Sequence, residues 1–381
     1  MIVAGEASGD MHAAKLVNAL RDAANSTSFK FFGATGPKLR EAGVETVVNA
    51  DGLSIVGLPE IARALPVFLK AFFELKAAAV SREADAVILV DFPDFNLKLA
   101  KALKKQGIKV FYYISPQLWA WRKYRIRIIR KYVDLLITIL PFEKDWYAQH
   151  GVMHVEYVGS PLAREVHAET SKDEFCLKHG IGPEKPIVSL LPGSRHKEIV
   201  RILPIMLETA AAMAEKQHDL QFVIALASTR SLKDVENVMR NAELTFKLPK
   251  NLFVIAGETF DALNASDAAA VTSGTATLET TIIGTPMAIV YKTSALNYKL
   301  LRPLISVEHF GLVNLIAGER VAREMIQDEF TADSLADELF RLLEPSENEK
   351  MREKLAKTTD KLGHGGASRR AAEAVLRMLE K

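Results

Sequence analysis

The stretch that decides the fold reads Val188-Ser189-Leu190-Leu191-Pro192-Gly193-Ser194-Arg195-His196-Lys197-Glu198. An apolar run of strand length, 187–191, is followed by a turn at Pro192-Gly193-Ser194 and then by apolar residues at helical spacing. Open α/β sheets use strand, glycine turn and helix to direct backbone N–H groups and a positive helix end toward an anion. Arg195 adds a planar guanidinium group that suits phosphate oxygens. Taken alone, these residues fit a phosphate site and a structural turn with a surface arginine equally well.

The second half of the chain repeats this alternation of strand and helix. Short apolar runs predict strands at 222–226, 252–255, 267–271 and 287–291. The third of them runs into Thr272-Ser273-Gly274-Thr275-Ala276-Thr277-Leu278-Glu279, a second glycine turn before a helix. Ser273, Gly274, Thr275 and Ala276 can hold a phosphate through N–H and hydroxyl groups. Glu279 lies one turn into the helix, where it can accept hydrogen bonds from a ribose diol.

The first half has the same rhythm, with strands predicted at 1–4, 29–34, 86–90, 110–114, 135–139 and 155–158. The first strand is short for a buried parallel strand, which leaves open a natural start upstream of Met1. It leads through Gly5-Glu6-Ala7-Ser8-Gly9-Asp10 into a helix near 12–24, and Ser8 or Asp10 can cap that helix. This turn lacks the G-x-G-x-x-G spacing of dinucleotide folds, so by itself it is weak support for a ligand.

Carboxylates follow the strand at 86–90, in Asp91-Phe92-Pro93-Asp94-Phe95-Asn96. Acids just past the carboxyl end of a parallel strand lie where α/β folds bind their ligands, and one of the pair could act as a general base. The structural alternative is that Asp94 or Asn96 only caps the next helix. The two roles are compatible, since one aspartate can cap while the other does chemistry.

The strand at 110–114 is followed by Ser115-Pro116-Gln117-Leu118-Trp119-Ala120-Trp121-Arg122, which holds two of the three tryptophans. A basic helix comes next, with Lys123, Arg125, Arg127, Arg130 and Lys131. A solvated face, an RNA-binding face and an anionic membrane contact all fit this pattern. With a net charge of only +2, nucleic acid is the least favoured of the three.

The segment 58–80 is unusually apolar and includes Val67, Phe68, Phe72 and Phe73. Lys70, Glu74 and Lys76 interrupt it, so it should not span a bilayer. It fits either a helix buried on the sheet or an interfacial helix that meets lipid, and the residues alone favour the buried helix.

Composition is that of an ordinary globular protein, with 49% hydrophobic and 25% charged residues. The single cysteine, Cys176, excludes an intrachain disulfide framework and fits a reducing compartment. We expect no signal peptide, no membrane-spanning helix and no dedicated metal cluster. We predict an α/β protein with mostly parallel sheets and three parts. These are an N-terminal domain over 1–162, a C-terminal domain over 163–355, and a terminal helix over 356–381 that crosses back to the first domain or packs on a partner chain.

Five of these motifs, in this order, resemble the lipid-A-disaccharide synthase family over essentially the whole chain. They are 5–10, 91–96, 115–121, Leu191-Pro192-Gly193-Ser194-Arg195 and 273–279. The family pattern also has Leu-Pro-Asn near its end. Here the chain reads Leu312-Val313-Asn314, so the proline is missing while the asparagine is kept.

The resemblance implies a GT-B fold, with two Rossmann-like domains facing across a cleft. It implies transfer of diacylglucosamine from UDP-2,3-diacylglucosamine to the 6-hydroxyl of 2,3-diacylglucosamine 1-phosphate (lipid X), with inversion and release of UDP. The base is then Asp94, with Asp91 as its rival, and Arg195 steadies the leaving diphosphate. The donor site comprises Gly193, Ser194, Arg195, Ser273, Gly274, Thr275, Ala276, Glu279 and Asn314. The acceptor site comprises Glu6, Ser8, Gly9, Asp10, Ser115, Trp119 and Trp121.

The resemblance also changes how the apolar segment is interpreted. Both substrates carry acyl chains, so Val67, Phe68, Phe72 and Phe73 are now expected to meet acyl chains or the membrane. Residues 122–131 become candidates for anionic headgroups or the acceptor phosphate. We expect no cofactor, a place on the cytoplasmic face of the inner membrane, and no nucleic acid. The acyl-chain length and a homodimer are left open.

Two other functions remain compatible with the residues. One is a UDP-N-acetylglucosamine epimerase, or another UDP-sugar enzyme on the same fold, and the apolar segment argues against it. The other is a non-catalytic protein that binds a nucleotide sugar, and the carboxylates at the end of strand 86–90 argue against that.

Overall fold

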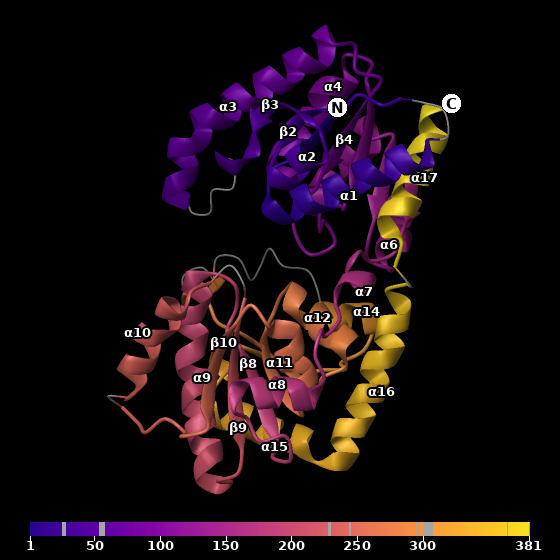
Figure 1. Cartoon of the computed structure of the whole chain (residues 1–381). Coiled ribbons are helices and arrows are strands. Elements are labelled where there is room, and N and C mark those ends of the chain that lie inside the picture. Colours follow the sequence, from indigo (N-terminus) through magenta and orange to yellow (C-terminus); the bar gives the residue numbers. More distant parts are fainter. Residues whose placement is uncertain are drawn as a thin grey trace. The chain divides into compact units, whose positions relative to one another are not determined.

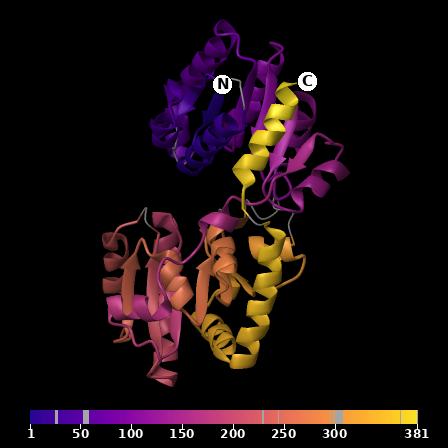
Figure 2. The ribbon, with the colours of Figure 1, turned by 45° about the vertical axis from the view of Figure 1, so that its right-hand side comes forward.

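The computed structural model describes residues 1–24, 28–52, 58–227, 230–243, 245–295, 298–299, 308–363 and 365–380. The chain divides into two compact units, Met1–Pro161 with His364–Lys381 and Leu162–Gly363 (Figure 1; Figure 2). The segment 356–381, predicted as one terminal part, is shared between them. Its first residues end helix α16 (Pro345–Lys361) in the second unit, and its last form helix α17 (Ala367–Leu379) in the first.

The first unit is built on a seven-stranded sheet with strand order β3-β2-β1-β4-β5-β6-β7. All of its described pairings are parallel, as predicted. Its strands are β1 (Ile2–Ala4), β2 (Phe32–Thr35), β3 (Glu45–Asn49), β4 (Ala86–Val90), β5 (Lys109–Tyr113), β6 (Leu135–Thr138) and β7 (Val155–Tyr157). Its other helices are α1 (Ala7–Ala23), α2 (Pro37–Glu41), α3 (Leu58–Ser81), α4 (Pro93–Lys104), α5 (Ile126–Tyr132) and α6 (Glu143–Gln149).

Successive strand residues of this unit supply two apolar layers, because neighbouring side chains in a strand point to opposite faces. Val3, Leu89 and Tyr112 pack with α3 and α4 on one face. Ile2 and Tyr113 pack with α1 and α17 on the other face, so residues 367–379 complete a core that begins at the first strand.

The second unit has a six-stranded parallel sheet with order β10-β9-β8-β11-β12-β13. Its strands are β8 (Ile187–Leu191), β9 (Gln221–Leu226), β10 (Leu252–Ala256), β11 (Ala268–Thr272), β12 (Met287–Tyr291) and β13 (Glu324–Ile326). Its helices are α7 (Leu162–Glu165), α8 (Lys172–His179), α9 (His196–Lys216), α10 (Leu232–Glu243), α11 (Thr259–Ala265), α12 (Thr275–Ile283), α14 (Leu312–Ala317), α15 (Ala332–Leu343) and α16. The α/β class is thus confirmed in both units.

Two edge strands and one helix start depart from the predictions. Neither β3 nor β13 was predicted, because each carries only two consecutive apolar residues, and β3 is in addition mostly exposed. Helix α1 begins at Ala7 instead of near residue 12, with Glu6 at its N-cap position. Ser8 and Asp10 therefore lie inside the helix, and the prediction that one of them caps it is wrong.

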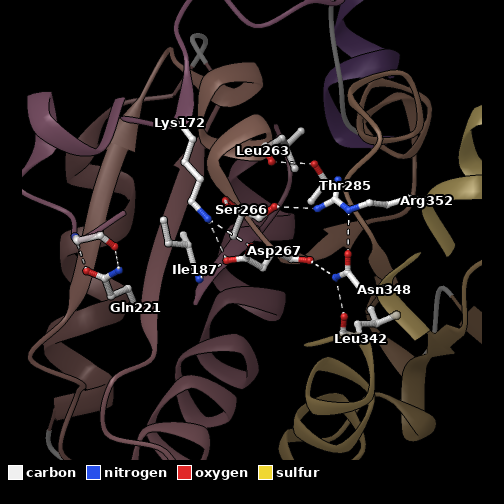
Figure 3. A network of polar contacts seen from close by, with 12 residues as sticks. Lys172, Ile187, Gln221, Leu263, Ser266, Asp267, Thr285, Leu342, Asn348 and Arg352 are labelled. Carbon is white, nitrogen blue, oxygen red and sulfur yellow. Dashed lines mark hydrogen bonds and ion pairs between the residues drawn. The ribbon is translucent and has the colours of Figure 1, made fainter. Parts of the chain in front are cut away.

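A polar network fixes α16 to the amino edge of the second sheet (Figure 3). Asp267, just before β11, accepts the N–H of Ile187 at 2.9 Å through its carboxylate and the Asn348 amide at 2.7 Å through its backbone carbonyl. Arg352 of α16 donates to Asn348 and, at 2.8 Å, to the carbonyl of Gly284 at the end of α12. These groups satisfy one another, so the network anchors α16 beside the end of α12.

Candidate functional site

Both glycine turns of the second unit line one cavity of about 300 Å³ at the carboxyl edge of its sheet. This is where open α/β sheets bind ligands. The cavity gathers eight of the predicted donor residues, namely Gly193, Ser194, Arg195, Ser273, Gly274, Thr275, Ala276 and Glu279. Glu198, Thr259 and Thr272 also line it and were not predicted. The available signal for Glu198 was a glutamate at the third position of the helix that starts at His196, where such a residue can accept N–H groups of the preceding turn.

Glu198 organises the first turn. Its Oε2 accepts the backbone N–H groups of Ser194 and Arg195, both at 3.1 Å, and its Oε1 lies 3.2 Å from the Arg195 guanidinium. Gly193 has φ 109°, and a Cβ there would lie 2.5 Å from Glu198, so only glycine fits. These two N–H groups, which we expected to face an anion, therefore bind an internal carboxylate, and Arg195 is the group of this turn that reaches outward.

In the second turn, no side chain caps the N-terminal end of helix α12. Gly274, with φ 150°, precedes α12 at the N-cap position and offers no side-chain cap. The first N–H groups of a helix have no acceptor within the helix, and the helix dipole makes this end attractive to anions. Glu279 lies further along the same helix, and burial raises the pKa of its carboxyl group. The turn thus places anion donors and a hydrogen-bonding carboxyl group on one cavity wall.

Asn314 lies outside the cavity lining, in the buried first turn of α14. Its amide donates to Ala322 and to Glu324, both at 2.8 Å. Its carbonyl accepts the N–H groups of Val321 and Ala322 at 2.8 and 2.9 Å. All the hydrogen bonds that an amide side chain ordinarily makes are thus formed within the protein, and they fix the loop at residues 321–324.

In the first unit, Asp91 and Asp94 follow β4 through a turn of left-handed backbone. Asp91 has φ 46° and Phe92 has φ 52°, conformations that non-glycine residues adopt at a cost of about 1–3 kcal/mol each. The Asp91 carbonyl is held at 2.7 Å by both the Tyr112 hydroxyl and the Asn96 amide. A Cβ at Gly5 would lie within 2.6 Å of the Phe92 ring, so glycine there allows the turn to pack.

The two aspartates differ in their surroundings. Burial, reinforced by the charge of Glu6, raises the pKa of Asp91 to about 6. Asp94 is more exposed, and its Oδ1 binds the guanidinium groups of Arg122 and Arg125. Burial opposes these ion pairs, yet the net effect is a lowered pKa for Asp94.

The predicted acceptor residues near the N-terminus separate into two groups. Glu6 and Ser8 are exposed, whereas Gly9 is buried next to β4. Asp10 is buried, and its carboxylate accepts the N–H groups of Gly36, Lys38 and Leu39 at 2.7 to 3.3 Å. Asp10 therefore caps α2, and its oxygens are not directed to a substrate.

Glu143 organises the Ser115–Trp121 loop and was not predicted. Its Oε1 accepts the Ser115 hydroxyl at 2.6 Å and the Trp119 indole N–H at 3.1 Å, and its Oε2 accepts the N–H of Leu140 at 3.1 Å. Complete burial raises the pKa of Glu143 to about 7, although these hydrogen bonds act to lower it. Trp119 is thus a buried anchor, whereas Trp121 is exposed, with the Arg122 guanidinium 4.1 Å from its ring.

Helix α3 is buried on one side and exposed on the other, so it fits both interpretations of the apolar segment. Its side chains are described from Leu65 onward. Ala71, Leu75 and Ala79 are buried against the sheet. Phe68 and Phe72 are half-buried beside Phe92 and Phe95. The opposite side leaves large apolar groups in solvent, with Leu65, Val67 and Leu69 each about half exposed and Phe73 62% exposed.

A larger cavity, about 650 Å³, lies at the amino edge of the second sheet. Lys172 and Asp267, which form an ion pair at 3.3 Å, line it together with Arg352, which donates to Asn348 and to backbone carbonyls, and none of the turn residues reaches it. Among the residues that the structure describes, no cluster of histidine, cysteine or acidic side chains could hold a metal ion. No helix within the same residues is long and apolar enough to cross a membrane.

Comparisons with known proteins agree over the whole length. The family model for lipid-A-disaccharide synthetase matches residues 1–378. Lipid-A-disaccharide synthase from Trichlorobacter lovleyi is 44% identical, covering 100% of this chain and 97% of its own. The enzyme of the same name from Geobacter sulfurreducens is 43% identical, with the same coverage.

Solved structures share the fold at low identity. UDP-GlcNAc 2-epimerase from Neisseria meningitidis, bound to UDP-GlcNAc, is 14% identical, with a TM-score of 0.64 and 99% of each chain covered. The calicheamicin glycosyltransferase CalG4 is 15% identical, with a TM-score of 0.58, covering 100% of this chain and 97% of its own. Since the fold is common to epimerases and glycosyltransferases, it does not distinguish between these activities.

Proposed function

Because the chain belongs to the lipid-A-disaccharide synthase family, a family of glycosyltransferases, we propose that it joins UDP-2,3-diacylglucosamine to lipid X. The products are the β-1,6-linked disaccharide 1-phosphate and UDP, with inversion at the anomeric carbon. The structural observation that supports this most is the cavity shared by the two glycine turns, which offers anion donors and a carboxyl group to a nucleotide sugar.

The diphosphate of the donor binds between Arg195 and the start of α12. Arg195 contributes an exposed cation, since its side chain is 70% exposed and pairs with Glu198 of the same turn. The helix start at Gly274 and Thr275 contributes N–H groups and the helix dipole. Both stabilise the charge that develops on UDP as it leaves. Glu279 binds the ribose of the donor.

Asp94 is the proposed base for the acceptor hydroxyl. Arg122 and Arg125 hold its Oδ1 and orient the carboxylate, which leaves Oδ2 for the hydroxyl. These ion pairs lower the pKa of Asp94, which makes its carboxylate a weaker base. The same lowered pKa keeps the carboxylate ionised at every pH where the enzyme would work. Asp91 is the rival, since its pKa of about 6 is closer to the range in which general bases are efficient.

The exposed side of α3 is the proposed contact with acyl chains and with the cytoplasmic face of the inner membrane. Its exposed residues Leu65, Val67, Leu69 and Phe73 form an apolar surface of the kind that marks lipid or protein contacts. Within 122–131, the basic side chains other than Arg122 and Arg125, which bind Asp94, are candidates for anionic headgroups. A homodimer is not required for any of these steps.

The decisive experiment supplies UDP-diacylglucosamine with either lipid X or a soluble amino sugar, and measures UDP release and disaccharide formation. We expect disaccharide with lipid X alone. Release of UDP with soluble acceptors, or interconversion of UDP-N-acetylglucosamine epimers, would favour the alternative of another UDP-sugar enzyme on this fold.

A further inference from the structure

The edge strand β13 and the 3₁₀ turn after it (Gln327–Glu329) carry two side chains, Glu324 and Gln327, that do not line the donor cavity. Both bind backbone groups of the connection between β12 and α14, residues 292–311. The structure describes this connection at its two ends, 292–295 and 308–311, and at 298–299. Each of the two side chains holds one end.

Gln327 holds the beginning of the connection. Its Oε1 accepts the N–H of Thr293 at 2.6 Å, and its Nε2 donates to the carbonyl of Thr293 at 3.2 Å. The side-chain amide thus pairs with both backbone groups of one residue, as a neighbouring strand would. Gln327 is buried, and its backbone has the left-handed conformation, with φ 59°. This conformation, which is costly for a residue other than glycine, directs the side-chain amide to Thr293.

Glu324 holds the end of the connection. Its Oε2 accepts the N–H of Phe310 at 2.9 Å, and its Oε1 accepts the N–H of Gly311 at 2.9 Å and the Asn314 amide at 2.8 Å. A Cβ at Gly311 would lie 2.4 Å from the Cδ1 of Ile289 and 3.2 Å from the Oε1 of Glu324, so any larger residue there would crowd both side chains. Hydrogen bonds to a carboxylate are stronger than those between neutral groups, which makes this the firmer of the two attachments.

The end held by Glu324 is joined directly to the donor cavity. The Ser273 hydroxyl donates to the carbonyl of Phe310 at 3.0 Å, and Ser273 lines the cavity. The Phe310 backbone is therefore fixed from both sides, through its N–H by Glu324 and through its carbonyl by Ser273. A displacement of Phe310 would be transmitted to the turn at the start of α12.

We propose that Glu324 is a positioning residue for the donor, which fixes the backbone of Phe310 and thereby holds Ser273 in the geometry that binds the UDP moiety. The proposal rests on the assignment of the donor cavity made above. It assigns to the edge strand a role in nucleotide affinity, without contact between Glu324 and the nucleotide.

Glu324→Gln tests this with almost no change in size. Glutamine has one acceptor oxygen in place of two and turns an NH₂ group toward a backbone N–H, so at least one attachment is lost. We expect the UDP Kd, measured by calorimetry, and the donor KM to rise about tenfold, while kcat changes less than about threefold. The matched control is Glu319→Gln, which removes the same charge from an exposed residue paired with Lys354 and should leave both constants unchanged.

A UDP Kd within about twofold of the unmodified protein would overturn the proposal, even if the Tm falls, because the role of Glu324 would then be only structural. Should Glu324→Gln fail to fold, Glu324→Asp keeps the charge but shortens the side chain, with an expected rise of about threefold in the UDP Kd and the same criterion for rejection. UDP binding needs no acceptor. If lipid X is not the substrate, the unmodified protein forms no disaccharide, yet the comparison of UDP affinities still stands.

Discussion

The two units place their predicted site residues at the same kind of edge, the carboxyl ends of parallel strands, but they use them differently. In the second unit, eight of the predicted residues line one cavity, and the turns that carry them lie within a few residues of β8 and β11. In the first unit, Asp10, Ser115 and Trp119 are bound by other parts of the fold, whereas Asp94 and Trp121 are exposed and Asp91 is half-buried.

The difference shows what each kind of site requires. A glycine turn before a helix binds an anion mainly through its own backbone, so a local pattern is sufficient. A site built from side chains depends on which distant groups compete for them. Glu143, for example, comes from a different element and takes both Ser115 and Trp119.

The largest expected effect is on the carboxylates of the first unit. Asp94→Asn should lower kcat about 10³-fold, since it removes the general base, while the UDP Kd stays within about twofold. Steady-state turnover and calorimetry with UDP measure the two effects separately. The control is Asp145→Asn, at an exposed position in the first turn of α6, which should change neither.

The pH dependence of kcat/KM distinguishes the two aspartates in the same experiment. With Asp94 as the base, its lowered pKa keeps the rate level between about pH 5 and 7. A decline below about pH 6, together with a large loss of kcat in Asp91→Asn alone, would transfer the role to Asp91.

Arg195→Ala tests the second unit, where one cation is expected to act on the leaving group. We expect a loss of transition-state stabilisation of about 3 kcal/mol, or roughly 100-fold in turnover, together with weaker UDP binding. Arg240→Ala in α10, an exposed arginine of the same unit that donates to Asn237, is the matched control. Equal activity of the two variants would show that Arg195 does not act on the leaving group.

Glu143 gives the first unit a pH-dependent stability. Its carboxyl group has an unfolded value of 4.5, and burial raises its pKa to about 7, so the folded state holds a proton that the unfolded chain releases between these values. The free energy of unfolding should therefore fall as the pH rises from about 4.5 to 7, by at most about 3 kcal/mol. Urea denaturation followed by tryptophan fluorescence measures it, since Trp119, Trp121 and Trp146 all lie in the first unit.

Glu143→Gln should flatten this dependence, whereas Glu41→Gln at an exposed site should retain it. The same slope in all three proteins would show that Glu143 does not titrate in this range.

The smallest expected effect concerns helix α3. Val67→Ser with Phe73→Ser should weaken binding to anionic vesicles about tenfold with little change in Tm, because both side chains are exposed. Phe68→Ser and Phe72→Ser should instead lower the Tm, because these rings pack on Phe92 and Phe95. Leu177→Ser, at an exposed leucine of the second unit, is the control in the vesicle assay. Unchanged binding by the exposed pair would exclude α3 as the membrane contact.

The sequence alone determined the elements whose signal is local. The strands at 86–90, 187–191 and 287–291 coincide with β4, β8 and β12, because each is an apolar run buried on both faces and bounded by turn residues. The five motifs, in their order along the chain, were likewise sufficient to identify the family. β3 and β13 were missed because edge strands bury less and need no apolar run.

Only the tertiary structure decided which polar side chains are available to a substrate. Asp10 and Asn314 were predicted as site residues. In the structure the Asp10 carboxylate caps α2, and the Asn314 side chain forms its hydrogen bonds with residues 321–324. Glu143, Glu198 and Glu324 looked unremarkable, yet each accepts three hydrogen bonds that fix a loop. Periodicity and turn chemistry are properties of neighbouring residues and can be recognised in the sequence. Hydrogen-bond partners are assigned by burial, which forces each polar group to bind whatever the fold brings within reach.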